Sequence, residues 1–213
     1  MEVRVTETFF SLQGESSLVG VPTFFIRLTG CPLRCTYCDT AYAFHGGGLI
    51  RVEKLRDEAK ASGAHYVCVT GGEPLAQPEC LPLLTMLCDE GFTVSLETSG
   101  AMPIECVDQR VIKVVDIKTP NSGEVEKNRW QNIGYLLPQD QVKFVIGSRD
   151  DYDWSKKILE QYALPEKVNT VLFSPSEGRV QPADLAQWIL DDQLPIRFQL
   201  QLHKIIWGNK RGV

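Results

Sequence analysis

Long runs of basic residues are absent from this sequence. Its 213 residues carry 22 lysines and arginines against 27 aspartates and glutamates, and the densest basic spots are only the pairs Lys156-Lys157 and Lys210-Arg211. Binding along a nucleic-acid backbone requires a basic stripe, so the net charge of −5 predicts no nucleic-acid partner. A small-molecule substrate fits this composition better.

Long apolar runs are missing as well. No stretch approaches the ~20 apolar residues of a membrane span. The N-terminal MEVRVTETFF has no basic segment followed by a long apolar one, which a signal peptide would need. The seven cysteines are an odd number, which argues against a disulfide framework. We therefore expect no membrane contact and a cytoplasmic protein whose thiols stay reduced.

The order of the expected secondary structure predicts an α/β fold. We find no internal repeat, low-complexity stretch or domain linker, so we predict a single domain over 1–213. The expected strands are 22–30, 65–70, 92–98, 111–117, 141–146, 169–174 and 197–202, and the expected helices are 52–63, 79–91, 150–162 and 182–192, with a loop that could hold a short helix at 121–136. This alternation predicts βα units and a parallel sheet. A full eight-fold barrel needs ~250 residues, so we expect an incomplete or compressed barrel.

Polar motifs follow most of the predicted strands. The strand at 22–30 runs into a cysteine-rich loop, and later strands end in TGGEP (70–74), ETSG (97–100), DIKTP (116–120), SPSEG (174–178) and HK (203–204). The carboxyl ends of parallel strands meet at one rim, where such folds place their chemistry. This rim is therefore the candidate functional site.

The loop GCPLRCTYCDT holds three cysteines, Cys31, Cys35 and Cys38, in the spacing C-x3-C-x2-C. A zinc site of the Cys3His type would recruit His45, but that histidine lies in the glycine-rich FHGGG and no second C-x2-C pair exists. An iron–sulfur cluster is the sharper interpretation, since cubane clusters take cysteine thiolates, usually four. Three thiolates leave one iron open, and the amine and carboxylate of an amino acid could chelate it.

Two motifs together resemble those of the radical S-adenosylmethionine superfamily. These are C-x3-C-x2-C with Tyr37 directly before the third cysteine, and GGEP at 71–74 after the next strand. The resemblance implies an incomplete parallel (β/α)6-type partial barrel that binds a [4Fe–4S] cluster and S-adenosyl-L-methionine. It also implies that the reduced cluster cleaves the sulfonium to release a 5′-deoxyadenosyl radical, while the protein binds, orients and excludes water.

A narrower resemblance covers nearly the whole chain. ETFFSLQGESSLVGVPTFFIRLTGC, the CDT after the cysteines, DIKTP, VKFVI, LFSP and QLHKIIWG are similar to the 7-carboxy-7-deazaguanine synthase family of queuosine biosynthesis. That resemblance implies a radical ring contraction of 6-carboxy-5,6,7,8-tetrahydropterin to 7-carboxy-7-deazaguanine with loss of ammonia. It further implies Mg2+, a flavodoxin-like or ferredoxin-like one-electron reductant, and a homodimer.

The same resemblance implies the site residues. Cluster ligands would be Cys31, Cys35 and Cys38, with Thr40 as the Mg2+ ligand. S-adenosylmethionine would contact Tyr37, Cys38, Asp39, Gly72, Asp116, Ile117, Lys118, Ser174, Pro175, Ser176 and Glu177, and the substrate would contact Leu12, Gln13, Gly14, Arg27 and Thr70. No catalytic group is assigned beyond the cluster and the cofactor.

Arg27 can also be placed from the alternation of its strand. Side chains in a strand alternate between faces, so Phe25 and Arg27 share one face, and the set of Phe24, Ile26 and Leu28 suits packing under helices. This predicts that Arg27 points into the barrel, where a guanidinium needs a carboxylate. The substrate carboxylate is one candidate, and an internal pair with Glu97 is the rival.

Other interpretations stay open on the sequence alone. A radical S-adenosylmethionine activase that acts on a partner protein would lack a buried pocket, and a non-enzymatic iron–sulfur or zinc module would lack a substrate site. His203 fits a satisfied strand-terminal histidine nearly as well as a substrate contact. The remaining cysteines, Cys68, Cys80, Cys88 and Cys106, have no mutual metal spacing, and packing is their best interpretation.

Overall fold

A single nine-stranded sheet organises the protein in a computed structural model that describes residues 1–213. The strands are β1 (Glu2–Leu12), β2 (Pro22–Leu28), β3 (Gly48–Arg51), β4 (Tyr66–Gly71), β5 (Thr93–Thr98), β6 (Ile112–Asp116), β7 (Gln141–Ile146), β8 (Thr170–Pro175) and β9 (Arg197–Phe198). Their spatial order is β3-β1-β2-β4-β5-β6-β7-β8-β9. All strands from β2 to β9 except β3 run parallel, and the sheet stays open because its edge strands, β3 and β9, do not pair with each other.

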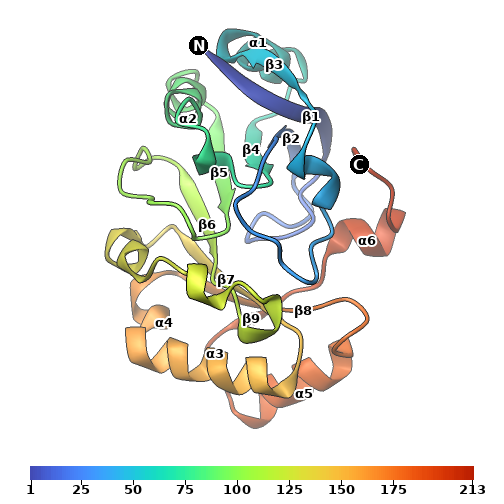
Figure 1. Ribbon diagram of the computed structural model, residues 1–213, viewed down its shortest axis with the longest axis vertical. Helices are drawn as coiled ribbons and strands as arrows, with labels where there is room; N and C mark the ends of the chain where they lie inside the picture. Colours follow the sequence, from blue (N-terminus) through green and yellow to red (C-terminus); the bar gives the residue numbers. More distant parts are fainter.

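Helices lie around the outside of the curved sheet (Figure 1). They are α1 (Val52–Ala61), α2 (Cys80–Asp89), α3 (Arg149–Tyr162), α4 (Leu164–Lys167), α5 (Pro182–Asp191) and α6 (Leu202–Trp207). The β5–β6 connection contains no helix, and the β6–β7 connection contains only 3₁₀ turns, at Pro120–Ser122, Val125–Lys127 and Trp130–Tyr135. The result is the predicted incomplete α/β barrel.

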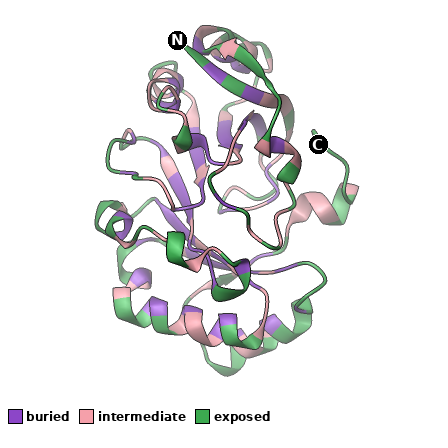
Figure 2. Ribbon diagram, in the orientation of Figure 1, coloured by how far each residue is buried: buried purple, intermediate pink, exposed green.

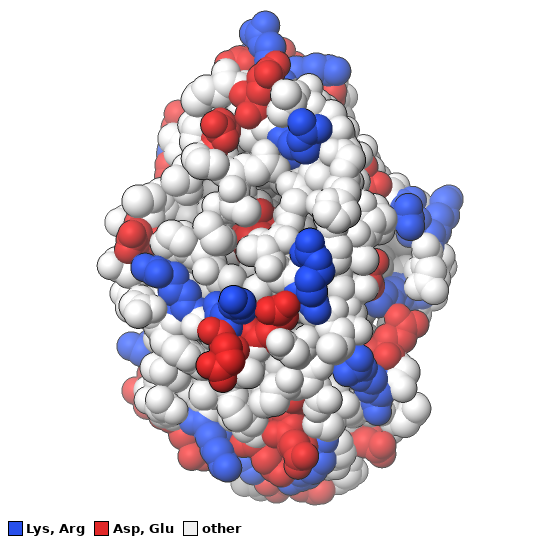
Figure 3. All heavy atoms as spheres, in the orientation of Figure 1, with Lys and Arg blue, Asp and Glu red and all other residues white.

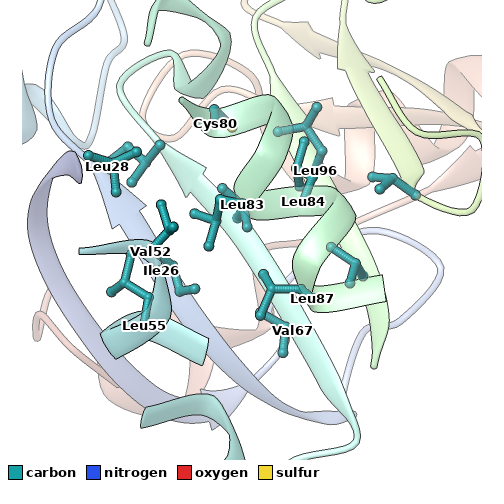
Figure 4. Close-up of a cluster of buried hydrophobic side chains, with 14 of the residues drawn as sticks. Ile26, Leu28, Val52, Leu55, Val67, Cys80, Leu83, Leu84, Leu87 and Leu96 are labelled. Carbon is teal, nitrogen blue, oxygen red and sulfur yellow. The ribbon is translucent and has the colours of Figure 1, made fainter. Parts of the chain in front are cut away.

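Buried residues concentrate on the strands and on one side of the helices, as Figure 2 shows. Phe24, Ile26 and Leu28 of β2 are buried in one core cluster, together with Leu83 and Leu84 of α2 (Figure 4). A second cluster packs α3 and α5 against β7 and β8. The alternation predicted for β2 is therefore confirmed, and it leaves the opposite face of this strand for the barrel interior.

The sequence predictions about the fold were wrong or incomplete at two places. Strands β1 and β3 were not predicted, and they pair antiparallel at one edge of an otherwise parallel sheet. The strand expected over 197–202 is limited to Arg197–Phe198, after which the chain forms α6. His203 therefore lies on a helix, not at a strand end. The loop at 121–136 does hold short helices, all of the 3₁₀ type, of which the longest is Trp130–Tyr135.

The surface carries no stripe of one charge on the face seen in Figure 3, where acidic and basic side chains are interspersed. None of the helices combines the length and the apolarity that crossing a membrane requires.

Candidate functional site

A cavity of about 570 Å³ opens at the carboxyl ends of the parallel strands, within the ~300–1,000 Å³ range of small-molecule sites. Its walls come from the β1–β2 loop, the cysteine loop, the ends of β4 to β8, and α6. The predicted site residues that line it are Leu12, Gln13, Gly14, Arg27, Cys31, Cys35, Tyr37, Cys38, Asp39, Thr40, Thr70, Gly72, Asp116, Lys118, Ser174, Pro175, Ser176 and Glu177.

Ile117 is the one predicted site residue that does not line the cavity. Its side chain is 5% exposed and belongs to the core cluster that includes Val142 and Phe144. Since neighbouring side chains of an extended chain point to opposite sides, Asp116 and Ile117 cannot both face the cavity. Only the backbone of Ile117 remains available to a ligand.

Hydrogen bonds from distant segments hold the cysteine loop in place. Arg34 N donates to Glu124 Oε1 at 2.6 Å, and Thr36 N donates to the carbonyl of Ser122 at 3.0 Å. Within the loop, Cys38 N donates to the carbonyl of Cys35 at 3.1 Å. The three thiols are partly exposed and line the same cavity. The loop therefore presents all three sulfurs to one space although its backbone is irregular.

The GGEP segment packs directly against this loop. Glu73 N donates to the carbonyl of Gly30 at 2.7 Å. A Cβ on Gly72 would lie 2.2 Å from that same carbonyl oxygen and 2.9 Å from the Cβ of Cys31. No side chain fits in that space, so glycine at 72 allows the backbone of this segment to approach the cysteines.

Glu73 anchors the GGEP segment to the ETSG segment after β5. Its carboxylate is fully buried and accepts hydrogen bonds from Leu75 N at 3.0 Å, Ser99 N at 2.7 Å and Thr98 Oγ1 at 2.9 Å, with the Ser99 hydroxyl as a further donor. No lysine or arginine pairs with it, so hydrogen-bond donors alone stabilise this carboxylate. Two of the predicted strand-end motifs are thus one hydrogen-bonded unit.

The donor set of the cavity fits a cubane cluster better than a single metal ion. Nowhere in the chain do three His, Cys, Asp or Glu side chains come together as a site for one ion, so the zinc alternative gains no support. In a cubane, cysteine thiolates bind the cluster, so the ligands need not converge on one point. Burial raises the pKa of all three thiols, that of Cys35 to about 11.

Unpartnered polar atoms around the cysteines also fit a bound polar cofactor. Tyr37 Oη, Asp116 Oδ1 and Ser176 Oγ are buried without a hydrogen-bond partner, and all three residues line the cavity. Buried polar atoms are normally hydrogen-bonded, so these atoms call for a ligand or ordered water. S-adenosylmethionine has an amine, a carboxylate, a ribose and an adenine to offer them.

Asp116 and Lys118 form an ion pair at the end of β6. Lys118 Nζ lies 2.8 Å from Asp116 Oδ2. Burial opposes the charge on Lys118, but Asp116 and the neighbouring Tyr37 raise its pKa well above the usual range. Lys118 therefore stays a cation at neutral pH and keeps one oxygen of Asp116 occupied while the other faces no donor.

Arg27 lines the cavity as predicted, but its internal partner differs from the expected one. Its Nε lies 2.8 Å from Glu7 Oε1 on β1, and the hydroxyl of Tyr42 donates to the same oxygen at 2.8 Å. The predicted rival, Glu97, instead accepts hydrogen bonds from Gln13 and Thr70. Residues 7 and 27 face each other across the β1–β2 ladder, and β1 was not predicted. The terminal Nη groups of Arg27 make no hydrogen bond.

Thr40 sits beside an ionic network on the cavity wall. Its hydroxyl donates to Asp39 Oδ1 at 2.9 Å, and Lys204 of α6 lies 3.0 Å from Asp39 and 2.9 Å from Glu177. Burial opposes ionisation of Asp39, yet Lys204 holds the pKa of this carboxyl well below its usual range. An oxygen-rich corner of the cavity therefore lies next to the three thiols.

Sequence reasoning did not assign roles to several charged residues of the cavity. Lys143 forms an ion pair with Glu15, and both line the cavity beside Glu97. The alternation of QVKFVI could have indicated this position, since Gln141, Lys143 and Val145 share the face opposite the buried Val142 and Phe144. The polar LQGE segment indicated a functional position at Glu15 rather than a plain turn, but it assigned no role to this carboxylate.

Known proteins resemble this chain over nearly its full length. A model described as the radical SAM superfamily matches residues 25–114. The 7-carboxy-7-deazaguanine synthases of Koribacter versatilis and Chlorobaculum tepidum are 43% and 42% identical to it, covering 96% and 99% of this chain and 97% of each relative. The crystal structure of QueE from Escherichia coli has the same fold, with a TM-score of 0.79 at 24% identity over 95% of each chain.

The family model and these relatives together identify a radical S-adenosylmethionine enzyme, a class that depends on a [4Fe–4S] cluster and S-adenosylmethionine. The relatives narrow the assignment further. The chain belongs to the 7-carboxy-7-deazaguanine synthase family.

Proposed function

We propose that this enzyme converts 6-carboxy-5,6,7,8-tetrahydropterin to 7-carboxy-7-deazaguanine with loss of ammonia. The observation that carries the proposal is one cavity lined by the three cysteines, by Gly71 and Gly72, by Gln13 and by Arg27. Family membership supports the reaction. An activase would need an open surface for a partner protein, and a cavity of about 570 Å³ favours a small molecule instead.

Cys31, Cys35 and Cys38 would hold the [4Fe–4S] cluster. Bound there, the cluster and S-adenosylmethionine supply a 5′-deoxyadenosyl radical. Gly72 provides the close backbone approach at which the methionine amine would be bound, and the unpartnered Asp116 Oδ1 would accept a hydrogen bond from that amine or from a ribose hydroxyl. The other predicted cofactor contacts are Tyr37, Cys38, Asp39, Ile117 through its backbone, Lys118, Ser174, Pro175, Ser176 and Glu177.

The substrate would lie between the β1–β2 loop and β2. Leu12, Gln13, Gly14 and Thr70 would contact the pterin ring, and Arg27 would bind its carboxylate through the free Nη groups. Glu7 holds the Nε side of that guanidinium, so the fork is oriented before the substrate arrives. Such positioning keeps the reacting carbon near the site of radical formation and limits side reactions with water.

Thr40 would bind Mg2+ beside the substrate. Mg2+ prefers oxygen ligands and keeps several waters, so one hydroxyl together with a substrate carboxylate is a plausible set. The thiols nearby are soft ligands and would not compete for it.

The electron must come from outside the chain, and we propose a flavodoxin-like or ferredoxin-like donor. We also propose that the chain acts as a homodimer. Both proposals rest on the family resemblance. Analytical ultracentrifugation would test the dimer, and reduction of the cluster by each purified donor would test the reductant.

The direct test is anaerobic incubation of the reconstituted protein with S-adenosylmethionine, reductant and the carboxypterin. Mass spectrometry should detect the deazaguanine acid, and a Cys35→Ala variant should yield neither this product nor the brown absorbance of the cluster. Cleavage of S-adenosylmethionine without any deazaguanine product would refute the proposed substrate. Iron-free, zinc-bearing protein after reconstitution would refute the radical chemistry.

A further inference from the structure

The β1–β2 loop, residues 13–21, bridges the open side of the barrel. Strands β1 and β2 lie near one end of the sheet order, while β7 and β9 lie toward the other end. The loop nevertheless bonds to the β7 and β9 side: Leu202 N donates to the carbonyl of Gly14 at 2.9 Å, and two glutamine side chains bind its centre. Hydrogen bonds to this loop thus take the place of the missing strand pairing.

Gln199 binds the loop with both ends of its amide. Gln199 Oε1 accepts from Ser16 N at 2.8 Å, and Gln199 Nε2 donates to the carbonyl of Ser16 at 2.8 Å. The side chain is 5% exposed and does not line the cavity. It pairs with one loop residue much as a neighbouring strand would, and two well-formed bonds fix that residue in position.

Gln141 makes a second bidentate contact at the next residue. Gln141 Oε1 accepts from Ser17 N at 2.8 Å, and its Nε2 donates to Ser17 Oγ at 2.7 Å. Gln141 begins β7, two residues before Lys143, whose ammonium pairs with Glu15 of the same loop. Each of three successive loop residues is therefore tied to the far side of the barrel.

The backbone of the loop needs such restraint at Ser16. Its φ is +67°, in the left-handed region that non-glycine residues avoid, and the residue is 1% exposed. Residues in this region persist only where the surrounding contacts hold them in place. The Gln199 amide provides these contacts, because it binds both the N–H and the carbonyl of Ser16.

We propose that Gln141 and Gln199, which together we call the glutamine clamp, are positioning residues for substrate binding. They fix Ser16 and Ser17, and this fixes Gln13 and Glu15, which precede them and face the cavity. The inference rests on the proposed function, because it takes the carboxypterin as the ligand of this loop. Removing either amide releases the loop, so that carboxypterin binding must then restore its order.

The test compares Gln199→Met and Gln141→Met, which keep side-chain length but lose both hydrogen bonds. A matched control is Gln139→Met, since the exposed Gln139 donates one amide bond to the carbonyl of Gln109 far from the cavity. Each clamp variant should raise the KM for the carboxypterin roughly tenfold, the equivalent of about 1.4 kcal/mol. The affinity for S-adenosylmethionine, measured without substrate, should change less than twofold.

Gln199→Glu is a harsher comparison, because it keeps the acceptor for Ser16 N but places a carboxylate oxygen against the carbonyl of Ser16. Its KM should be at least as high as that of Gln199→Met, and Gln141→Met keeps the proposal testable if the variants at 199 fail to fold. Unchanged carboxypterin KM in the folded variants would overturn the proposal. Equal losses of carboxypterin and S-adenosylmethionine affinity would also overturn it, since they would indicate a general structural role.

Amide hydrogen exchange of residues 13–21 separates this inference from the proposed function. Exchange should be slow in the wild-type protein and in Gln139→Met, and faster in both clamp variants, without any substrate present. If the wild-type protein forms no deazaguanine acid but shows this exchange pattern, the proposed function fails while the clamp stands. If product forms but exchange does not change, the clamp fails.

Discussion

At the scale of single residues, Arg27 shows how an internal partner can prepare a binding group. Glu7 takes the Nε side of the guanidinium and leaves the Nη groups without hydrogen bonds. Lysine at 27 would keep the charge but offer no planar fork. The contact with Glu7 thus orients the guanidinium while its Nη groups stay available to a ligand.

Arg27→Lys should weaken carboxypterin binding and leave S-adenosylmethionine binding nearly unchanged. Loss of a charge-assisted hydrogen bond costs roughly 1.5–3 kcal/mol, or about one to two decades in affinity. Titration of both ligands checks this, with Arg149→Lys, which alters an exposed pair with Asp153, as the matched control. Unaltered carboxypterin affinity combined with a lower melting temperature would show that Arg27 serves only the internal pair with Glu7.

Thr40→Val should abolish stimulation by Mg2+ and leave the cluster intact. The substitution removes the only side-chain oxygen of residue 40 and nearly conserves its volume. Activity is measured against Mg2+ concentration, and the visible absorbance reports the cluster. Thr36→Val is the control, because the Thr36 hydroxyl of the same loop donates to the carbonyl of Asn121. A variant at position 40 that responds to Mg2+ like the wild-type protein would contradict the role of Thr40.

At the scale of elements, Glu73 couples two strand-end segments that sequence motifs treat separately. Each of its oxygens accepts one backbone N–H, Oε1 from Leu75 and Oε2 from Ser99. A glutamine at 73 has only one such oxygen, so one buried N–H would face an amide nitrogen. Leaving a buried donor unsatisfied costs about 1–3 kcal/mol.

Glu73→Gln should therefore lower the melting temperature and also weaken S-adenosylmethionine binding, because GGEP packs on the cysteine loop through Gly72. Thermal unfolding and ligand titration measure the two effects. Glu79→Gln is a suitable control, since Glu79 lies just before α2 and its side chain caps nothing. Normal ligand affinity in a destabilised Glu73→Gln protein would show that the coupling does not reach the cofactor site.

The sequence predicted the parallel core because strands such as β2 and β4 combine apolar runs with a polar segment at the carboxyl end. The prediction of a strand failed at 197–202, where the alternation of glutamine and leucine suggests that the leucine side chains face the core. Instead Gln199 is buried and Leu200 is exposed, because Gln199 is bonded to the loop at Ser16. A contact between residues 183 positions apart leaves no local signal. For the same reason Glu7 could not be recognised as the partner of Arg27.

At the scale of the whole molecule, the ion pair between Lys143 and Glu15 joins β7 to the β1–β2 loop across the barrel interior. Burial opposes both charges. Even so, the partner charge raises the pKa of Lys143 above its usual range, and Lys143 together with the Gln201 amide holds the pKa of Glu15 below its usual range. Both shifts mean that the pair stabilises the folded chain at neutral pH.

The pH dependence of folding should reflect this pair. A carboxyl with a lowered folded pKa contributes stability above its unfolded pKa of about 4.3, and loses it as the pH falls toward the folded value. A lysine with a raised folded pKa contributes stability below its unfolded pKa of about 10.4, and loses it as the pH rises toward the folded value. The pair should therefore be fully effective between roughly pH 5 and pH 10.

The double variant Glu15→Gln/Lys143→Met removes the pair without leaving one buried charge alone, which would itself be costly. Its melting temperature, followed by circular dichroism on the cluster-free chain, should fall less steeply between pH 5 and pH 3 than that of the wild-type protein. The exposed i,i+4 pair of Arg149 and Asp153 gives a control double variant, Arg149→Met/Asp153→Asn, whose acid profile should follow the wild type because exposed pairs contribute little. Identical acid profiles for all three proteins would mean that the bridge across the barrel contributes no measurable stability, and that the β1–β2 loop is held by its hydrogen bonds alone.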